Sequence, residues 1–408
     1  MKSILIVLIV FGLAVGGVVW FALRDDRERV EPRVVPVETR ADDPAAIAAL
    51  EKLGAIFERD AGEKGRPVVG LTVRGMDIDD ARMKHVAGLP RLRSLTLNGT
   101  RTTDAGLLSL SKLEALESLS LDAAGVGDAG LVHLRNLRKL QTLSLRSNPI
   151  TDEGLKSLAG LTALRSLNLY GTTITDDGLF TLASLGELRK IDLSHTNIGD
   201  AGLMVLGRFP EMRELRLEKT RITSAGLAHL VSLAKLERLD VSANPGITNL
   251  GLSHVGKLRS LQSLFLAYTT IDEEGLEQLA GLTGLTSLSL SKTKVFGPKL
   301  EPFVNLQELW LDETSVRDSG LDTVKGLSKL RYLKLSFTDV TDRGVAFLVE
   351  LRALEELDLW KTKLTAKSLD SFGEMKQLKR LLLPSTEDLS EDAIANLQKA
   401  LPRTKIEN

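Results

Sequence analysis

The chain has 408 residues, of which 43% are hydrophobic, so it is long enough to bury a large core. Its 53 basic and 54 acidic side chains give a net charge of −1, which argues against the basic face that nucleic-acid binding needs. The sequence contains no cysteine, which excludes disulfide bonds, thiolate zinc sites and a cysteine nucleophile.

Residues 4–23 form an uncharged, largely apolar run close to the N-terminus. As a helix, a run of this length would span roughly 30 Å, the thickness of a bilayer core. Trp20 lies near its end, where aromatic rings favour the membrane interface. The run predicts a transmembrane signal anchor over residues 1–23. A cleaved signal peptide, cut near Ala14, is the alternative.

The flanks of this run bear on its orientation. Counting Lys and Arg alone would place the C-terminal side in the cytoplasm, because four arginines follow the run. Acidic residues interleave with these arginines, however, and the N-terminal tail is short. We therefore expect the rest of the chain on the extracytoplasmic side, or secreted if the signal is cleaved. Gly12 and Gly16 form a GxxxG motif, which is common by chance but can pair two helices into a homodimer.

Residues 24–42 are charged and contain Pro32 and Pro36, which is typical of a flexible linker. Apolar residues then recur at helical spacing over residues 44–59. Asp43 is placed to cap this helix, and Pro44 suits its first turn. We expect residues 43–70 to hold a capping helix that covers the first coil of the array that follows.

Residues 71–383 repeat one pattern, which is clearest over residues 143–175 as LxLxx[N/T]xITDxGLxxLxxLxxL. Fourteen L-x-L pairs occur, and eleven of the thirteen steps between them are 24 residues long. The step that starts at Leu239 has 25 residues and the step that starts at Leu288 has 21. A unit repeated in this way predicts a solenoid that folds as one elongated body. Residues 384–408 would form its C-terminal cap.

Each repeat predicts one coil of this solenoid. The leucines of L-x-L point inward from a short strand and the residues between them point outward, because side chains alternate along a strand. The Thr or Asn of the next turn can satisfy backbone groups that the sheet leaves open. The aspartate of T-D-x-G-L, such as Asp152, marks the start of a short helix, and we expect it to cap that helix.

The LxxLxLxxTxITDxGLxxL units resemble those of leucine-rich repeat proteins, especially the ribonuclease-inhibitor-like repeats and the arrays of planctomycete-type bacterial envelope proteins. The resemblance covers about residues 44–408. It implies an α/β fold, a right-handed solenoid of about fourteen coils with a parallel sheet on the concave face and short helices on the convex face. No F-box-like segment and no catalytic domain accompany the repeats.

The residues that face outward from the strands change character along the array. They are small and polar at first, then charged, and finally aromatic. All three tyrosines and two of the three tryptophans lie on or beside these strands. Exposed Trp, Tyr and Arg side chains dominate protein-binding surfaces, so we expect a partner-binding site here; the alternative is that the rings only cover leucine surface. The predicted binding residues are Arg216, Arg238, Phe265, Tyr268, Trp310, Tyr332, Phe337 and Trp360.

The 21-residue coil replaces T-D-x-G-L by residues 295–303, which include Pro298 and Pro302. Proline is poorly tolerated inside a helix. We expect this coil to lack the regular helix and to change the curvature of the solenoid beside Trp310. A neutral deletion is the alternative.

Catalytic and metal chemistry find little support in the sequence. Four of the five histidines occupy one slot of the repeat's helix, which indicates repetition and not a site. The repeated aspartates would form a ladder, but calcium needs six to eight oxygens gathered at about 2.3–2.6 Å. No phosphate-binding loop, Gly-x-Ser-x-Gly or His-Glu-x-x-His motif occurs. We expect no enzyme activity, no metal and no cofactor.

The sequence therefore predicts a membrane-anchored, non-catalytic module that binds a protein or peptide, or else an envelope polymer, on the concave sheet. The alternative is a structural envelope protein that associates with itself and has no dedicated ligand.

Overall fold

The computed structural model describes residues 41–73, 75, 78–386 and 389–408. The predicted signal anchor, its GxxxG motif and most of the linker lie outside these residues. Among the described residues, no helix is both long enough and apolar enough to cross a bilayer.

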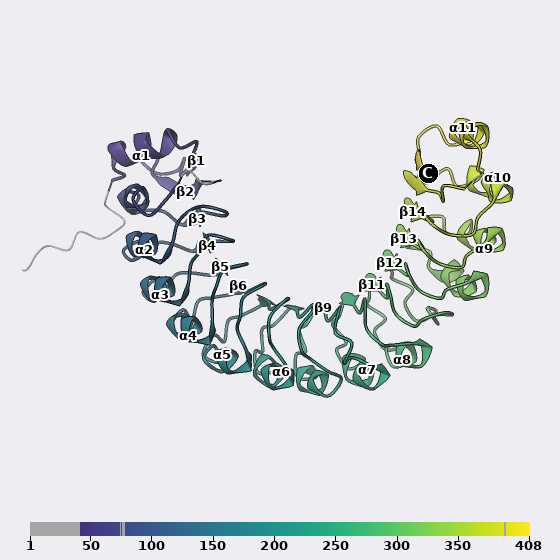
Figure 1. Cartoon of the computed structure of the whole chain (residues 1–408), viewed down its shortest axis with the longest axis horizontal. Helices are drawn as coiled ribbons and strands as arrows, with labels where there is room; N and C mark the ends of the chain where they lie inside the picture. Colours follow the sequence, from purple (N-terminus) through teal and green to yellow (C-terminus); the bar gives the residue numbers. More distant parts are fainter. Residues whose placement is uncertain (1–40, 74, 76–77, 387–388) are drawn as a thin grey trace, which may run out of the picture.

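The described chain forms a horseshoe, with one sheet lining its inner face and helices on its outer face (Figure 1). Sixteen strands follow one another across the sheet in chain order. β1 and β2 are antiparallel, and each later neighbour is parallel. The strands are β1 (Ile56–Arg59), β2 (Val68–Thr72), β3 (Ser94–Thr96), β4 (Ser118–Ser120), β5 (Thr142–Ser144), β6 (Ser166–Asn168), β7 (Lys190–Asp192), β8 (Glu214–Arg216), β9 (Arg238–Asp240), β10 (Ser263–Phe265), β11 (Ser287–Ser289), β12 (Glu308–Trp310), β13 (Tyr332–Lys334), β14 (Glu356–Asp358), β15 (Arg380–Leu382) and β16 (Lys405–Glu407).

The helices are short and alternate with the strands, except that in the described chain none lies between β1 and β2 or between β11 and β12. The α-helices are α1 (Pro44–Glu51), α2 (Asp104–Leu107), α3 (Asp128–Leu131), α4 (Asp152–Leu155), α5 (Asp176–Phe180), α6 (Asp200–Leu206), α7 (Asn249–Val255), α8 (Glu273–Glu277), α9 (Asp342–Leu348), α10 (Leu369–Gly373) and α11 (Glu391–Ala400). The 3-10 helices are η2 (Met83–Gly88), η3 (Leu108–Leu110), η4 (Val132–Leu134), η5 (Lys156–Leu158), η6 (Gly226–Leu230), η7 (Asp318–Gly326) and η8 (Ala366–Ser368). The predicted solenoid, with a concave sheet and convex helices, is confirmed.

The L-x-L leucines build the core, as their alternation predicts. Leu143 and Leu145 are fully buried, while Thr142 and Ser144 beside them reach the concave surface. Leu143 lies in register with the matching leucines of β4 and β6. Stacking of this kind joins the buried residues of the described chain into one cluster from Leu50 to Leu401. Each buried leucine contributes about 2 kcal/mol of hydrophobic stabilisation.

The Thr and Asn side chains of the turns hold the backbone as predicted. The Thr172 hydroxyl donates to the carbonyl of Leu169 at 2.7 Å. Asn148 is buried, and its Nδ2 donates to the carbonyls of Leu121 (2.7 Å) and Leu145 (3.0 Å). These bonds satisfy carbonyls that the narrow strands leave without a sheet partner.

The aspartates of the repeat do not cap their own helices, contrary to the prediction. Asp152 is the first residue of α4, and Thr151 caps that helix by accepting a bond from the backbone N–H of Glu153 at 3.3 Å. The Asp152 carboxylate instead accepts bonds from the backbone N–H (2.7 Å) and the hydroxyl (2.6 Å) of Thr175 in the next coil. The same pair of bonds joins Asp128 to Thr151, Asp200 to Thr223, Asp318 to Thr341 and Asp342 to Thr365.

The N-terminal cap is a helix followed by a strand, and not the single helix expected over residues 44–59. The Asp43 side chain caps α1 by accepting a bond from the N–H of Ala45 at 2.9 Å. The helix ends at Glu51, and Gly54 adopts a positive φ of 70°. Residues Ile56–Arg59 then pair with β2. This pairing satisfies backbone groups on an edge of β2 that would otherwise face solvent.

At the other end, α11 covers the last coil and β16 adds a strand beyond the fourteen that the L-x-L count predicts. The 21-residue coil has no helix between β11 and β12, as its prolines predict. The two strands still pair in register, Leu288 opposite Leu309. The predicted change in curvature stays a prediction.

Candidate partner-binding face

Three side chains of each coil project from the concave sheet: those before, between and after the paired leucines. On β12 they are Glu308, Trp310 and Asp312, and on β8 they are Glu214, Arg216 and Glu218. The residue that follows has a left-handed backbone in many coils, as in Tyr268 (φ 56°) and Phe337 (φ 57°). These four rows form the concave face and the rim beside it.

The predicted aromatic residues fall into two sets by their exposure, which we call the inner and the outer rings. The inner rings are Phe265, Trp310 and Tyr332. The centroid of Trp310 is 5.9 Å from that of Phe265 and 5.3 Å from that of Tyr332. Phe265 and Trp310 are both in register with Ser289 on the strand between them. The rings therefore meet over a small residue, and Ser289 is buried beneath them.

The outer rings are Tyr268 and Phe337, on the rim, and Trp360, which follows the paired leucines of β14. Phe337 and Trp360 make an edge-to-face pair with centroids 4.9 Å apart. Tyr268 is 52% exposed, Phe337 48% and Trp360 40%. The inner rings are half-buried, which fits the alternative that they cover the sheet as well as it fits a binding role. The outer rings expose more of their surface than the inner rings do, which makes them the stronger candidates for contact with a partner.

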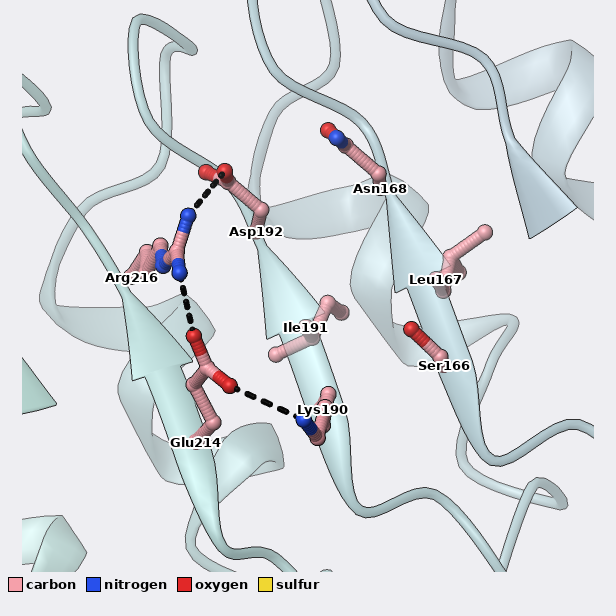
Figure 2. Close-up of a pocket in the computed structure, with 8 residues that line it drawn as sticks. All are labelled: Ser166, Leu167, Asn168, Lys190, Ile191, Asp192, Glu214 and Arg216. Atoms are coloured by element: carbon pink, nitrogen blue, oxygen red, sulfur yellow. Dashed lines mark ion pairs between the residues drawn. The ribbon is translucent and has the colours of Figure 1, made fainter. Parts of the chain in front are cut away.

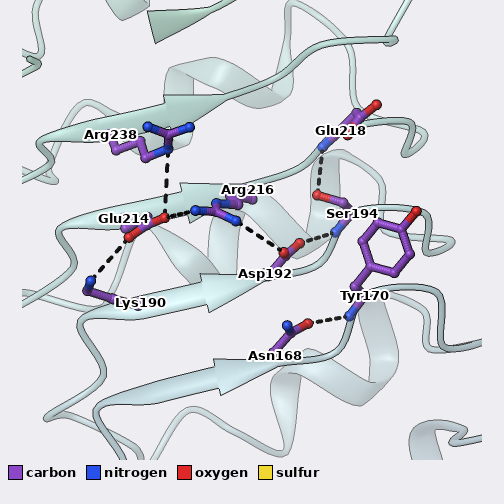
Figure 3. A network of polar contacts seen from close by, with 9 residues as sticks. All are labelled: Asn168, Tyr170, Lys190, Asp192, Ser194, Glu214, Arg216, Glu218 and Arg238. Carbon is purple, nitrogen blue, oxygen red and sulfur yellow. Dashed lines mark hydrogen bonds and ion pairs between the residues drawn. The ribbon is translucent and has the colours of Figure 1, made fainter. Parts of the chain in front are cut away.

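Arg216 and Arg238 differ in their relation to the rings, because only Arg238 contacts one of them. They belong to a charged cluster on β7 to β9, made by Lys190, Asp192, Glu214, Arg216 and Arg238 (Figure 3). Glu214 lies at its centre, 2.5 Å from Arg216, 3.3 Å from Lys190 and 3.7 Å from Arg238. The guanidinium carbon of Arg238 also lies 4.3 Å from the ring centroid of Phe265. Arg238 thus connects the charged cluster to the inner rings.

The cluster holds three cations and two carboxylates, so its formal net charge is +1. Burial of Glu214 acts to raise its pKa, but the charges of Arg216 and Lys190 and their hydrogen bonds outweigh burial and lower the pKa below its ordinary value of 4.5. All members of the cluster except Arg238 line a depression of about 250 Å³ on β6 to β8 (Figure 2). Its charged side chains are directed at one another across the strands, which favours a preorganised polar surface over a reactive centre.

Sequence reasoning missed a smaller group on the early strands. Tyr170 packs on His195, with ring centroids 4.7 Å apart, and the Arg146 guanidinium carbon lies 4.2 Å from the Tyr170 centroid. His195 occupies the left-handed rim position (φ 58°), whereas the other four histidines follow the helix slot. The position of His195 within the repeat, which differs from that of the other histidines, could have indicated this group from the sequence.

The described residues show no group of three or more His, Asp and Glu side chains that could hold a metal ion. The aspartate ladder offers no such site, because each carboxylate described above is bonded to the neighbouring coil.

The comparisons with known proteins agree with this architecture. A family model described as a leucine-rich repeat region matches residues 188–392, and a second leucine-rich repeat model matches residues 138–198. No curated protein matches the chain.

Solved structures share the fold at low sequence identity. An internalin from Listeria monocytogenes is 22% identical, with a TM-score of 0.58, over 91% of this chain and 97% of its own. A leucine-rich repeat protein from Leptospira interrogans is 19% identical, with a TM-score of 0.54, over 79% of this chain and 92% of its own. Because the first family model alone spans half of the sequence, the chain belongs to the leucine-rich repeat family.

Proposed function

We propose that this protein is a recognition module that binds another protein or a peptide on its concave face. Leucine-rich repeats are commonly interaction modules, because a stacked sheet offers an extended and rigid concave surface. The observation that carries the proposal is the exposure of Tyr268, Phe337 and Trp360 on that surface and its rim. A rigid scaffold loses little conformational entropy on binding, so exposed rings held in place can contribute strongly to affinity.

The proposal includes attachment to a membrane. The apolar run over residues 4–23 supports a signal anchor, and the short tail before it supports an extracytoplasmic repeat domain. The recognition function itself is carried by the repeats and not by this attachment.

The experiment is capture of partners by the full chain from the membranes of its native cells. The test variant is Trp310→Ala with Trp360→Ala, which removes one inner and one outer ring. The matched control is Phe180→Ala with Phe296→Ala, because these rings are also exposed (45% and 62%) but lie outside the strands. We expect the wild type and the control to hold the same partner and the tryptophan variant to lose it.

Two results would contradict the proposal. If the tryptophan variant, shown by circular dichroism to be folded, retains the partner, these residues are not the binding site. If all three forms capture only further copies of the same chain, the protein is a self-associating structural component.

A further inference from the structure

Carboxylates surround the inner rings of the concave face. Glu308 on β12 and Glu356 on β14 are the in-register neighbours of Tyr332, one on each side. Asp358 lies two residues after Glu356 on the same face, in register with Lys334. Tyr332 and Trp310 are thus bordered by acidic side chains along the sheet.

Among the described residues, none of these three carboxylates forms an ion pair, although Lys334 lies in register with Asp358 and Arg380 with Glu356. Two neighbouring acidic residues do form ion pairs: Asp312 lies 3.4 Å from Lys334, and Glu313 lies 2.9 Å from Lys292. In the described part of the chain, no basic nitrogen lies within 4.0 Å of the carboxylates of Glu308, Glu356 or Asp358.

The hydrogen bonds that these carboxylates accept come from uncharged groups. Glu308 accepts a bond from the Ser287 hydroxyl at 2.6 Å, and Asp358 accepts one from the backbone N–H of Trp360 at 3.0 Å. Arg380, the nearest cation beyond β14, is engaged by Glu407 at 3.1 Å. The charges of Arg331 and Arg380 act on the three carboxylates through space, but each guanidinium is paired with another carboxylate. Negative charge is therefore in excess beside the inner rings.

Other rings of the face already carry a cation of the same chain. Arg146 lies over Tyr170, Arg238 over Phe265, Lys292 over Tyr268 and Lys361 over Trp360, at 4.2 to 5.3 Å from the ring centroids. Within the described residues, Trp310 and Tyr332 have no such cation. Phe337 on the rim has none either, but it makes an edge-to-face pair with Trp360. Trp310 and Tyr332 are thus the two inner rings, beside the unpaired carboxylates, over which no cation of the described residues lies.

We propose that this part of the face binds a basic segment of the partner, with an arginine or lysine side chain placed against Trp310 and Tyr332 and paired with Glu308, Glu356 or Asp358. Aromatic faces attract cations, and guanidinium forms strong paired bonds to carboxylates. An acidic segment would meet three like charges at the same place. The inference rests on the proposed function and adds the chemistry of the partner.

The probe is a short fluorescent peptide of alternating arginine and glycine, titrated with the full chain in detergent. The comparison peptide replaces arginine by citrulline, which keeps the shape and removes the charge. We expect the arginine peptide to bind about tenfold more tightly than the citrulline peptide at moderate salt. Raising the salt concentration should reduce this difference, because the pairing is partly exposed.

The test variant is Glu308→Gln with Glu356→Gln, which removes two charges without breaking an ion pair. The matched control is Glu114→Gln with Glu274→Gln, two exposed residues outside the strands, which changes the net charge equally. The test variant should bind the arginine peptide about tenfold more weakly and lose its preference over citrulline. The control should match the wild type, and both variants should melt at the wild-type temperature.

Equal affinity of the wild type for the arginine and citrulline peptides would overturn the inference, as would undiminished binding by the test variant. Tighter binding of a glutamate peptide would also overturn it. None of these results affects the proposed function, which fails only if the Trp310→Ala, Trp360→Ala variant keeps the native partner. The two failures are therefore distinguishable.

Discussion

At the scale of single residues, the glycine of T-D-x-G-L is fixed by the coil before it. A Cβ on Gly130 would lie 2.5 Å from Asp104 Oδ1 and 3.1 Å from the Asp104 Cα. The same aspartate bonds to the backbone N–H of Gly127 and so cannot move away freely. The sequence shows that this glycine recurs in the repeat. The reason is a close contact between neighbouring coils, and the sequence of one repeat does not show that contact.

Replacement of Gly130 by alanine should therefore destabilise the protein. The added methyl group must displace an aspartate carboxylate and part of a backbone, which costs about 1–3 kcal/mol. Gly160→Ala is the matched control, since its Cβ would meet no atom within 4 Å. Urea denaturation followed by circular dichroism should show a lower midpoint for Gly130→Ala and an unchanged or slightly higher one for Gly160→Ala. Equal midpoints would contradict this explanation of the repeat.

The site residues could be predicted from sequence only in part, again for local reasons. Strand alternation placed Trp310 and Trp360 on the concave face. It did not predict that Phe265 and Trp310 meet across Ser289, because that contact depends on side-chain rotamers and on a small residue in another coil. Nor did it identify the left-handed rim position, where Tyr268 and Phe337 adopt a backbone that side chains other than glycine rarely favour.

At the scale of elements, the irregular parts were the least predictable. The missing helix between β11 and β12 followed from two prolines. The contact that joins this coil to the one before it could not be predicted in the same way. Glu273 takes the place of the usual aspartate, and its carboxylate accepts bonds from the backbone N–H groups of Phe296 and Gly297, the latter at 2.8 Å. The cap strand β1 was predicted as helix because its apolar residues also fit a helical spacing.

The last strand, β16, is held to the sheet partly by charge. The Glu407 carboxylate accepts hydrogen bonds from Arg380 and lies 2.6 Å from Lys405; these two contacts, with that of Arg380 the larger, lower its pKa from 4.5 to about 2. A pKa that is lower in the folded state means that the contact stabilises β16 fully above pH 4.5, less as the pH falls, and not at all below about 2.

We expect an NMR titration of the Glu407 carboxyl carbon to show a midpoint near pH 2. In Arg380→Gln the midpoint should rise towards the ordinary glutamate value, because the main partner is lost. Lys367→Gln, a change on η8 away from this pair, is the control and should leave the midpoint in place. A wild-type midpoint near 4.5 would show that the contact does not persist in solution.

At the scale of the whole molecule, periodicity made the architecture predictable. A leucine pair every 24 residues specifies a core that continues from coil to coil, and the in-register sheet is its direct consequence. The grouping of charged and aromatic side chains on one face follows from the same register. The sequence does not predict which of these side chains form ion pairs, because each pairing depends on side-chain positions in three or four coils at once.

A solenoid of this kind has stability that depends on where a defect lies, because each coil packs mainly on its neighbours. Leu215 on β8 and Leu381 on β15 are both fully buried and occupy the same place in the repeat, so truncation to alanine removes the same group from each, at a cost of about 2–5 kcal/mol. Leu381→Ala weakens only the end, so the last coils should open first while the rest unfolds near the wild-type midpoint.

Leu215→Ala should instead lower the main unfolding transition, because the central coils connect the two halves of the sheet. Urea denaturation combined with hydrogen exchange resolved along the chain separates the two cases: β14 to β16 alone should lose protection early in Leu381→Ala. If both variants shift one common transition by the same amount, the array unfolds as a single cooperative unit and the nearest-neighbour description is wrong for this protein.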